Sequence, residues 1–266
     1  MNQIRSSVMT TVANPPSDSA GRLPAVELKD VCLRFGNNKP VLDNLDLSIE
    51  SGQFVVLVGL SGCGKTTILN MIAGLAQPDS GTVTVLDQAP QAARAKMGYM
   101  PARDALLPWR SAVRNVEYPL ELRGVPKARR REIALDQLER LHMRDAAERW
   151  PWQLSHGMRQ RVALARTWAP NPELLLMDEP FAALDAQTRV AAQTELLGSW
   201  ESNRKTVVFV THDLSEALLL GDRVILVGEG GILKDMPVPF ERPRTLEVSM
   251  SPQFQDLRHE LWGLIH

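Results

Sequence analysis

The sequence has little cysteine, almost no net charge and no long apolar run. Its two cysteines, Cys32 and Cys63, cannot form a disulfide framework and suit a reducing compartment. Lys and Arg total 30 against 31 Asp and Glu, so the basic excess of a dedicated nucleic-acid binder is missing. The apolar runs at 54–59 and 174–177 are far shorter than the roughly 20 residues of a transmembrane helix. The N-terminus also lacks the apolar core of a secretory signal. We expect a cytosolic protein that reaches a membrane only through a partner.

The composition is that of a globular chain, with 44% hydrophobic and 23% charged residues. Residues 1–23 are rich in Ser, Pro, Asn and Thr and are expected to form a disordered arm. A continuous apolar run at 54–58 predicts a strand buried on both faces, followed by a glycine-rich turn and a helix over about 65–73. Strand patterns return at 174–178, 207–210 and 224–227 with helix-like stretches between them. This alternation predicts an α/β fold with a parallel sheet, into which a helical segment of about residues 109–169 is inserted.

A glycine-rich motif follows the first buried strand. Residues 59–66 match the pattern G-x-x-x-x-G-K-[ST] between a predicted strand and a predicted helix. Glycines let successive N–H groups turn towards a polyphosphate, and the helix N-terminus adds partial positive charge. The lysine reaches the β- and γ-phosphates, and the threonine hydroxyl ligates Mg²⁺. The predicted nucleotide-binding residues here are Gly59, Leu60, Ser61, Gly62, Cys63, Gly64, Lys65, Thr66 and Thr67.

Two carboxylates end the apolar strand at 174–178. Asp178 is placed to hold Mg²⁺, which prefers oxygen ligands and keeps several waters, so Thr66 and Asp178 are the predicted metal-site residues. Glu179 follows directly and can act as general base towards an attacking water. An acidic turn after a strand is common by itself, but together with the glycine-rich loop the pair indicates nucleotide hydrolysis.

Residues 154–161, Leu-Ser-His-Gly-Met-Arg-Gln-Arg, resemble the signature of the ATP-binding-cassette (ABC) transporter ATPases. The resemblance covers nearly the whole chain after Val26. It implies a P-loop NTPase (RecA-like) core with an N-terminal antiparallel β subdomain and an inserted α-helical signature subdomain. It also implies an ATP-binding domain over 24–247 and a C-terminal tail over 248–266 with one short helix. Further site residues implied by the family's motifs are Phe35 stacking on adenine, Asp185 in a loop crossing a dimer interface, His212 contacting the γ-phosphate, and Ser155 and Gly157.

The family resemblance implies an ATPase that works as a dimer. ATP and Mg²⁺ on the glycine-rich loop of one copy would be completed by Ser155 and Gly157 of a second copy, with Glu179 and His212 as the catalytic residues. The expected partners are integral membrane permease subunits and, through them, an extracytoplasmic solute-binding protein, with no nucleic acid. The protein would lie at the cytoplasmic face of the inner membrane. The sequence Leu-Leu-Pro-Trp at 106–109 is similar to that of the family branch that serves importers of nitrate, sulfonates and taurine.

Two departures from the family's pattern leave alternatives open. Ala102 occupies the place of the usual Gln, and His156 replaces the first Gly of the signature. We therefore expect slow basal hydrolysis, with Arg103 or Asp104 as candidate substitutes for the Gln once a partner docks. The alternative is a cassette protein with weak hydrolysis that acts as a regulatory or interaction subunit. A cassette acting on DNA or ribosomes would need long coiled-coil insertions or a second cassette. Core packing is the first expectation for four tryptophans of the helical segment, Trp109, Trp150, Trp152 and Trp168.

Overall fold

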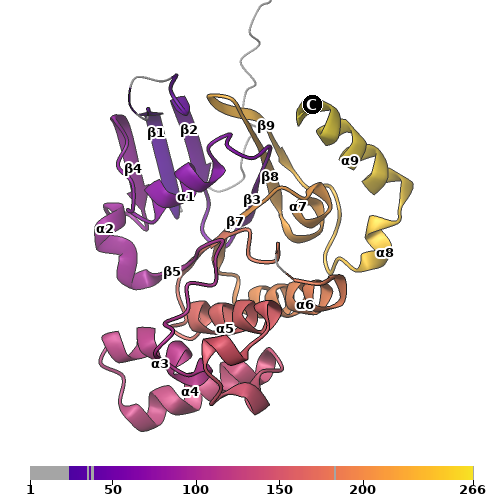
Figure 1. Ribbon diagram of the computed structural model, residues 1–266. Helices are drawn as coiled ribbons and strands as arrows, with labels where there is room; N and C mark the ends of the chain where they lie inside the picture. Colours follow the sequence, from indigo (N-terminus) through magenta and orange to yellow (C-terminus); the bar gives the residue numbers. More distant parts are fainter. Residues whose placement is uncertain (1–23, 35, 37–38, 183, 266) are drawn as a thin grey trace, which may run out of the picture.

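The computed structural model describes residues 24–34, 36, 39–182 and 184–265. Its first sheet has three antiparallel strands in the order β2 (Leu42–Ile49), β1 (Val26–Leu33) and β4 (Ser80–Val85). Leu45, Leu47 and Ile49 alternate with polar residues along β2 and are buried. This sheet forms the indigo part of Figure 1 and confirms the expected N-terminal antiparallel unit.

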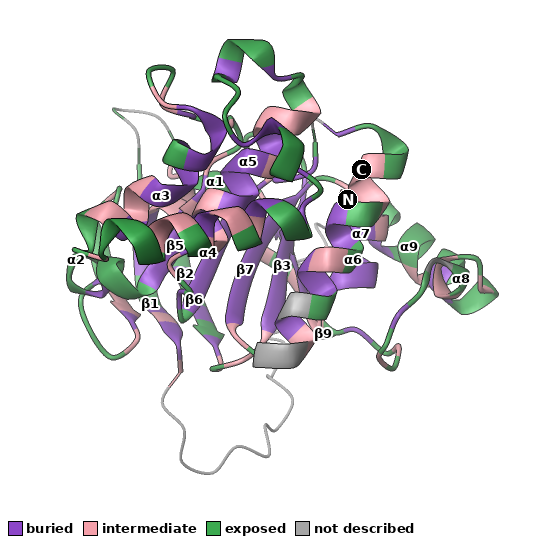
Figure 2. Ribbon diagram, turned by 90° about the horizontal axis from the view of Figure 1, so that it is seen from below, coloured by how far each residue is buried: buried purple, intermediate pink, exposed green. Residues whose placement is uncertain are grey.

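The second sheet has six strands and forms the centre of the molecule. Its order is β5 (Met97–Met100), β6 (Leu174–Asp178), β7 (Thr206–Thr211), β3 (Phe54–Val58), β8 (Arg223–Gly228) and β9 (Gly231–Pro237). Neighbours are parallel from β5 through β8, whereas β9 is antiparallel to β8. Strands β3, β6 and β7 are buried along their whole length, because elements cover both faces of the sheet (Figure 2). The predicted α/β class with a parallel sheet is confirmed.

The helices connect the strands of the two sheets. Three of them, α3, α4 and α5, lie together between β5 and β6 in sequence and occupy the lower part of Figure 1, away from the antiparallel sheet. The α-helices are α1 (Lys65–Ile72), α2 (Pro90–Ala93), α3 (Ala112–Leu122), α4 (Lys127–Arg140), α5 (His156–Trp168), α6 (Ala186–Asn203), α7 (Leu214–Leu220), α8 (Leu246–Ser249) and α9 (Pro252–Ile265). Short 3₁₀ helices are η1 (Arg94–Lys96), η2 (Arg144–Ala146) and η3 (Pro151–Gln153).

Strand β3 divides the core into two clusters because its side chains alternate between the faces of the sheet. Phe54, Val56 and Val58 belong to the cluster that includes the helical segment and α6. Val55 and Leu57 belong to the cluster shared with α1 and the antiparallel sheet. One buried strand thus joins both layers and fixes the position of the loop that follows it.

Some expectations differ from the structure. Residues 1–23 lie outside the described part of the chain. The C-terminal segment forms a 14-residue helix, α9, preceded by α8, where one short helix was expected. Trp109, Trp152 and Trp150 are 68%, 67% and 36% exposed, so core packing is wrong for these three, and Trp150 stacks on Trp152 at 5.0 Å between ring centroids. Trp168 is partly buried and packs against the core, as expected. Among the described residues, none of the helices combines the length and apolarity needed to cross a membrane.

Candidate functional site

The glycine-rich loop joins β3 to α1 and approaches the neighbouring strand closely. A Cβ at Gly59 would lie 2.1 Å from the carbonyl oxygen of Val227, so only glycine fits there. Gly64 precedes α1 at a φ of 106° in the left-handed region. The Lys65 ammonium is buried and donates to the carbonyls of Gly59 and Leu60 at 2.8 and 2.7 Å. The loop therefore wraps around its own lysine.

Thr66 and Asp178 meet at the carboxyl ends of the parallel strands. The Thr66 hydroxyl donates to both carboxylate oxygens of Asp178, at 3.2 and 3.1 Å. Asp178 is the buried last residue of β6, and burial raises the pKa of its carboxyl above the usual value, although the Thr66 hydrogen bond and Lys65 act in the opposite direction. The two predicted metal-site residues thus present their oxygen atoms together.

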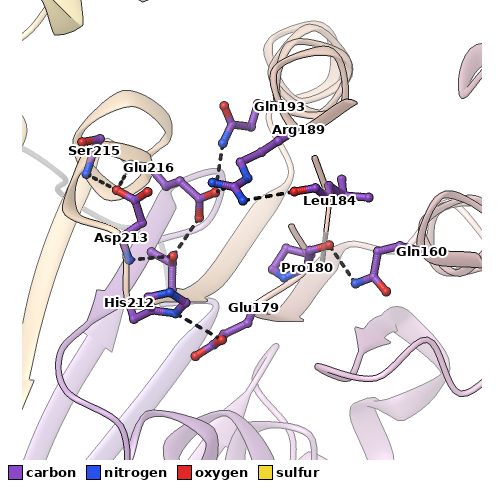
Figure 3. A network of polar contacts seen from close by, with 11 residues as sticks. Gln160, Glu179, Pro180, Leu184, Arg189, Gln193, His212, Asp213, Ser215 and Glu216 are labelled. Atoms are coloured by element: carbon purple, nitrogen blue, oxygen red, sulfur yellow. Dashed lines mark hydrogen bonds and ion pairs between the residues drawn. The ribbon is translucent and has the colours of Figure 1, made fainter. Parts of the chain in front are cut away.

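Glu179 lies next to His212 at the carboxyl ends of β6 and β7 (Figure 3). His212 Nδ1 is 3.2 Å from Glu179 Oε2, and the ring donates this bond when the proton is on Nδ1. Glu179 has a φ of 45°, uncommon for a residue other than glycine. Its backbone N–H donates to the carbonyl of Val210 at 2.9 Å, which holds this conformation. Strained backbone of this kind concentrates at functional sites.

Helix α5 reaches the same loop from the other side. Buried Gln160 donates through Nε2 to the carbonyl of Pro180 at 2.8 Å, directly after Glu179 (Figure 3). The contact links the helix that contains most of the signature residues to the loop that carries Glu179.

Ser155, Gly157 and Asp185 lie at helix N-termini away from the glycine-rich loop. The Ser155 hydroxyl accepts from Met158 N at 3.3 Å and caps α5, whose first turn contains Gly157. Asp185 accepts from Thr188 N at 3.0 Å and caps α6; these Thr188 hydrogen bonds lower the pKa of its carboxyl. Within the described chain, no hydrogen bond or ion pair joins these three residues to residues 59–67. Phe35 lies outside the described residues.

The segment after Ala102 is attached to α5. Arg159 Nε donates to Asp104 Oδ2 at 2.8 Å, and Arg159 Nη2 lies 3.0 Å from His156 Nδ1. Arg166 donates to the carbonyls of Asp104 and Ala105, both at 2.8 Å. Asp104 is therefore paired with Arg159 in the single chain, and its substitution for the missing Gln when a partner docks stays a prediction.

Two features of the site were not predicted from the sequence. The buried carboxylate of Glu216 accepts a hydrogen bond from Thr211, the neighbour of His212. Helix α9 places Trp262 and His259 beside His212, around a cavity of about 490 Å³. No sequence motif indicates either feature, because both depend on how distant elements pack.

A glycine loop with a buried lysine, a hydroxyl–carboxylate pair and a second carboxylate beside a histidine are the features of a phosphate-loop nucleoside triphosphatase (NTPase). Residues 42–182 match the ABC transporter family. An ABC transporter ATP-binding protein of Methanocaldococcus jannaschii is 46% identical over 232 residues, covering 86% of each chain. The taurine import ATP-binding protein TauB of Escherichia coli O157:H7 is 41% identical over 227 residues, 83% of this chain and 89% of TauB.

A solved structure shows the same architecture. The dimeric, post-hydrolysis state of the ATP-binding cassette MJ0796, bound to ADP and Pi, superposes with a TM-score of 0.74 at 33% identity. It covers 81% of this chain and 100% of the cassette. The chain belongs to the ABC transporter family, as an ATP-binding cassette whose ATPase activity is coupled to transport, and the resemblance inferred from the signature is confirmed.

Proposed function

We propose that this chain is the ATP-hydrolysing subunit of an importer for a small solute of the nitrate, sulfonate or taurine kind. The proposal rests on two contacts: the Thr66 hydroxyl bonds the Asp178 carboxylate, and the neighbouring Glu179 contacts His212. These four side chains come from three separate segments of the chain. Their convergence at the carboxyl ends of β6 and β7 supports hydrolysis at that edge.

The glycine-rich loop would hold the phosphates of ATP. Backbone N–H groups of residues 59–67 and the α1 N-terminus offer the donors, while Lys65 exchanges its carbonyl contacts for the β- and γ-phosphates. The oxygen atoms of Thr66 and Asp178 fit a Mg²⁺ ion, which binds hard oxygen ligands. When bound, this ion neutralises charge on the phosphates. Asp178, buried and costly to ionise alone, would then have a cationic partner.

Glu179 is the proposed general base. Its carboxylate would accept a proton from the attacking water, and His212 would hold it in place and contact the γ-phosphate. The backbone of Glu179, fixed by Val210, limits how far the carboxylate can move.

The second half of each site would come from another copy of the chain. Ser155 and Gly157 at the N-terminus of α5, together with Asp185 at the N-terminus of α6, would face the partner's nucleotide, and Phe35 would stack on adenine. Their separation from residues 59–67 within one chain supports contributions in trans. The dimeric state of the MJ0796 cassette supports the same arrangement.

The import role is supported by the likeness to TauB, whose name assigns it to taurine import. The chain would bind integral membrane permease subunits at the cytoplasmic face of the inner membrane, and a solute-binding protein would act through those subunits. Within the chain, residues 24–247 would form the ATP-binding domain with the helical subdomain at about 109–169, and residues 248–266 the tail. A cassette that binds ATP but turns over weakly is the second candidate, favoured by Ala102.

Phosphate release by the purified protein, alone and with the membrane subunits that co-purify with it, tests this function. We expect Lys65→Ala to abolish release, while Lys127→Ala, at the exposed start of α4, leaves it unchanged. Tight MgATP binding without phosphate release, even in the complex, would establish the weakly hydrolysing alternative. Stimulation of release by taurine, nitrate or a sulfonate in the complex identifies the solute.

A further inference from the structure

Glu216 is a carboxylate enclosed in the protein next to the proposed catalytic residues. It lies in α7 with 8% of its surface exposed. Buried carboxylates are rare because ionisation away from water is costly unless partners compensate. Burial accordingly raises the pKa of Glu216, opposed by its Thr211 hydrogen bond and by Arg189. The contacts that offset the cost of burying this carboxylate reach two segments of the chain, one around His212 and one at the start of α6.

The first set of contacts brackets His212. The Thr211 hydroxyl donates to Glu216 Oε2 at 2.7 Å and accepts from the backbone N–H of Asp213 at 3.0 Å. His212 stands between these two residues, so a single hydroxyl joins the backbone on both sides of it. Because Thr211 is only 2% exposed, water does not compete for these bonds. Glu216 thereby fixes the place from which the imidazole extends.

The second set reaches the start of α6 (Figure 3). Gln193 donates to Glu216 Oε1 at 3.1 Å, and Arg189 Nε lies 3.9 Å from the same oxygen. Arg189 Nη2 also donates to the carbonyl of Leu184 at 3.1 Å, one residue before Asp185. Arg189 Nε is buried without a hydrogen-bond partner. A buried donor close to a carboxylate oxygen is unsatisfied, so a small movement that brings them together is favourable.

We propose that Glu216 and Arg189 are positioning residues that link the segment at Leu184–Asp185 to the orientation of His212. This link rests on the proposed function, in which His212 acts at the nucleotide and Asp185 faces a second copy of the chain. A shift of Leu184 moves Arg189 through its carbonyl bond and changes the distance from Nε to Glu216. Glu216 passes the change to Thr211, and so to His212. Docking of a second copy then adjusts the contact between His212 and Glu179.

Steady-state hydrolysis by the purified chain tests the link with variants on both of its sides. Thr211→Val removes the hydroxyl but keeps the shape, Thr211→Ser restores it, and Glu216→Gln removes the charge. We expect Thr211→Val and Glu216→Gln each to lower kcat by roughly tenfold, because a misplaced catalytic contact costs that much or more. KM for ATP stays within about twofold, since residues 59–67 are untouched. Thr211→Ser should recover most of the rate, which a general loss of stability would not predict.

Arg189→Met completes the cycle. Combined with Glu216→Gln it should add little further loss, because both changes break one link. The Hill coefficient of wild type should exceed one and approach one in each link variant. Asp136→Asn, whose exposed partner Arg140 lies on the same helix, is the matched control and should change neither quantity.

The outcomes separate the link from the proposed function. If wild type hydrolyses ATP and Thr211→Val and Glu216→Gln keep kcat within about twofold, the link is wrong and the proposed function stands. A drop in Thr211→Val that Thr211→Ser fails to restore also contradicts the link. If wild type neither hydrolyses ATP nor dimerises with it, the proposed function fails and the link loses its basis.

Discussion

The Thr66 hydroxyl contacts both carboxylate oxygens of Asp178, although the two residues are 112 positions apart. This contact joins the first turn of α1, which follows β3, to the end of β6; β7 lies between β3 and β6 in the sheet. The two residues meet because the parallel sheet brings the carboxyl ends of both strands to one side of the molecule.

Asp178→Asn should stabilise the free protein while it destroys activity. Burial makes the ionised carboxylate costly, whereas the amide oxygen still accepts from Thr66. We expect roughly 1 kcal/mol of added stability, about 2–4 °C in Tm. The additional stabilisation by MgATP over ATP without metal should disappear. Thermal unfolding of the free protein, with ATP alone and with MgATP measures both the added stability and the lost effect of Mg²⁺. A lower Tm of the free variant would argue against a costly buried charge.

Cys63 should react with alkylating reagents in a manner that depends on nucleotide. It lies in the glycine-rich loop, half-buried, with Lys65 Nζ 3.8 Å from its sulfur. MgATP on the loop should slow labelling by roughly tenfold or more, in line with occupancy of the site. Cys32, also free and half-buried but in β1, is the internal control and should label at one rate throughout. Mass spectrometry of both sites distinguishes them; equal protection of the two, or of neither, would refute a nucleotide contact at Cys63.

Ala102→Gln should raise the basal rate of hydrolysis. Ala102 is exposed and carries no amide, and the nearby Asp104 carboxylate is paired with Arg159. Restoring an amide that reaches the site recovers up to ~10²-fold, the usual cost of a lost orienting contact. Phosphate release by the isolated protein measures it. Ala102→Leu, which adds bulk without an amide, is the control, and an equal gain in that variant would contradict the explanation.

The contribution of Glu216 to the stability of the protein should decrease as pH rises. Burial raises its pKa above 4.5, so the native state binds this proton more tightly than the unfolded state does. The contribution of Glu216 to stability is therefore largest below 4.5 and falls as pH rises through the window up to the raised native value. Glu216→Gln lacks this loss, so its Tm relative to wild type should increase across that window. Identical profiles of Tm against pH for the two proteins would show that burial does not raise the pKa of Glu216.

Local patterns predicted much of this architecture. The apolar runs at 54–58 and 174–178 became β3 and β6 unchanged, because a strand buried on both faces needs no polar alternation. The glycine-rich loop and α1 followed from glycine spacing and the lysine, and the carboxylates from their place at a strand end.

Contacts between distant segments could not be predicted in this way. Glu216 resembles any acidic residue on a helix until Arg189 and Gln193 of α6 surround it. The Asp104–Arg159 pair spans 55 positions, and no spacing rule connects them. The tryptophans were misjudged for a related reason: aromatic character favours burial on average, yet Trp109 and Trp152 lie on the surface of the helical segment.

The most direct test of the account is hydrolysis by Glu179→Gln. The amide keeps the shape of the side chain and can still contact His212, but it cannot accept a proton from water. We predict ATP affinity within about twofold of wild type, phosphate release reduced by roughly 10²-fold or more, and an ATP-dependent dimer visible by size-exclusion chromatography with light scattering. Phosphate release within a few-fold of wild type would contradict the role of Glu179 as general base, and with it the proposed mechanism of hydrolysis.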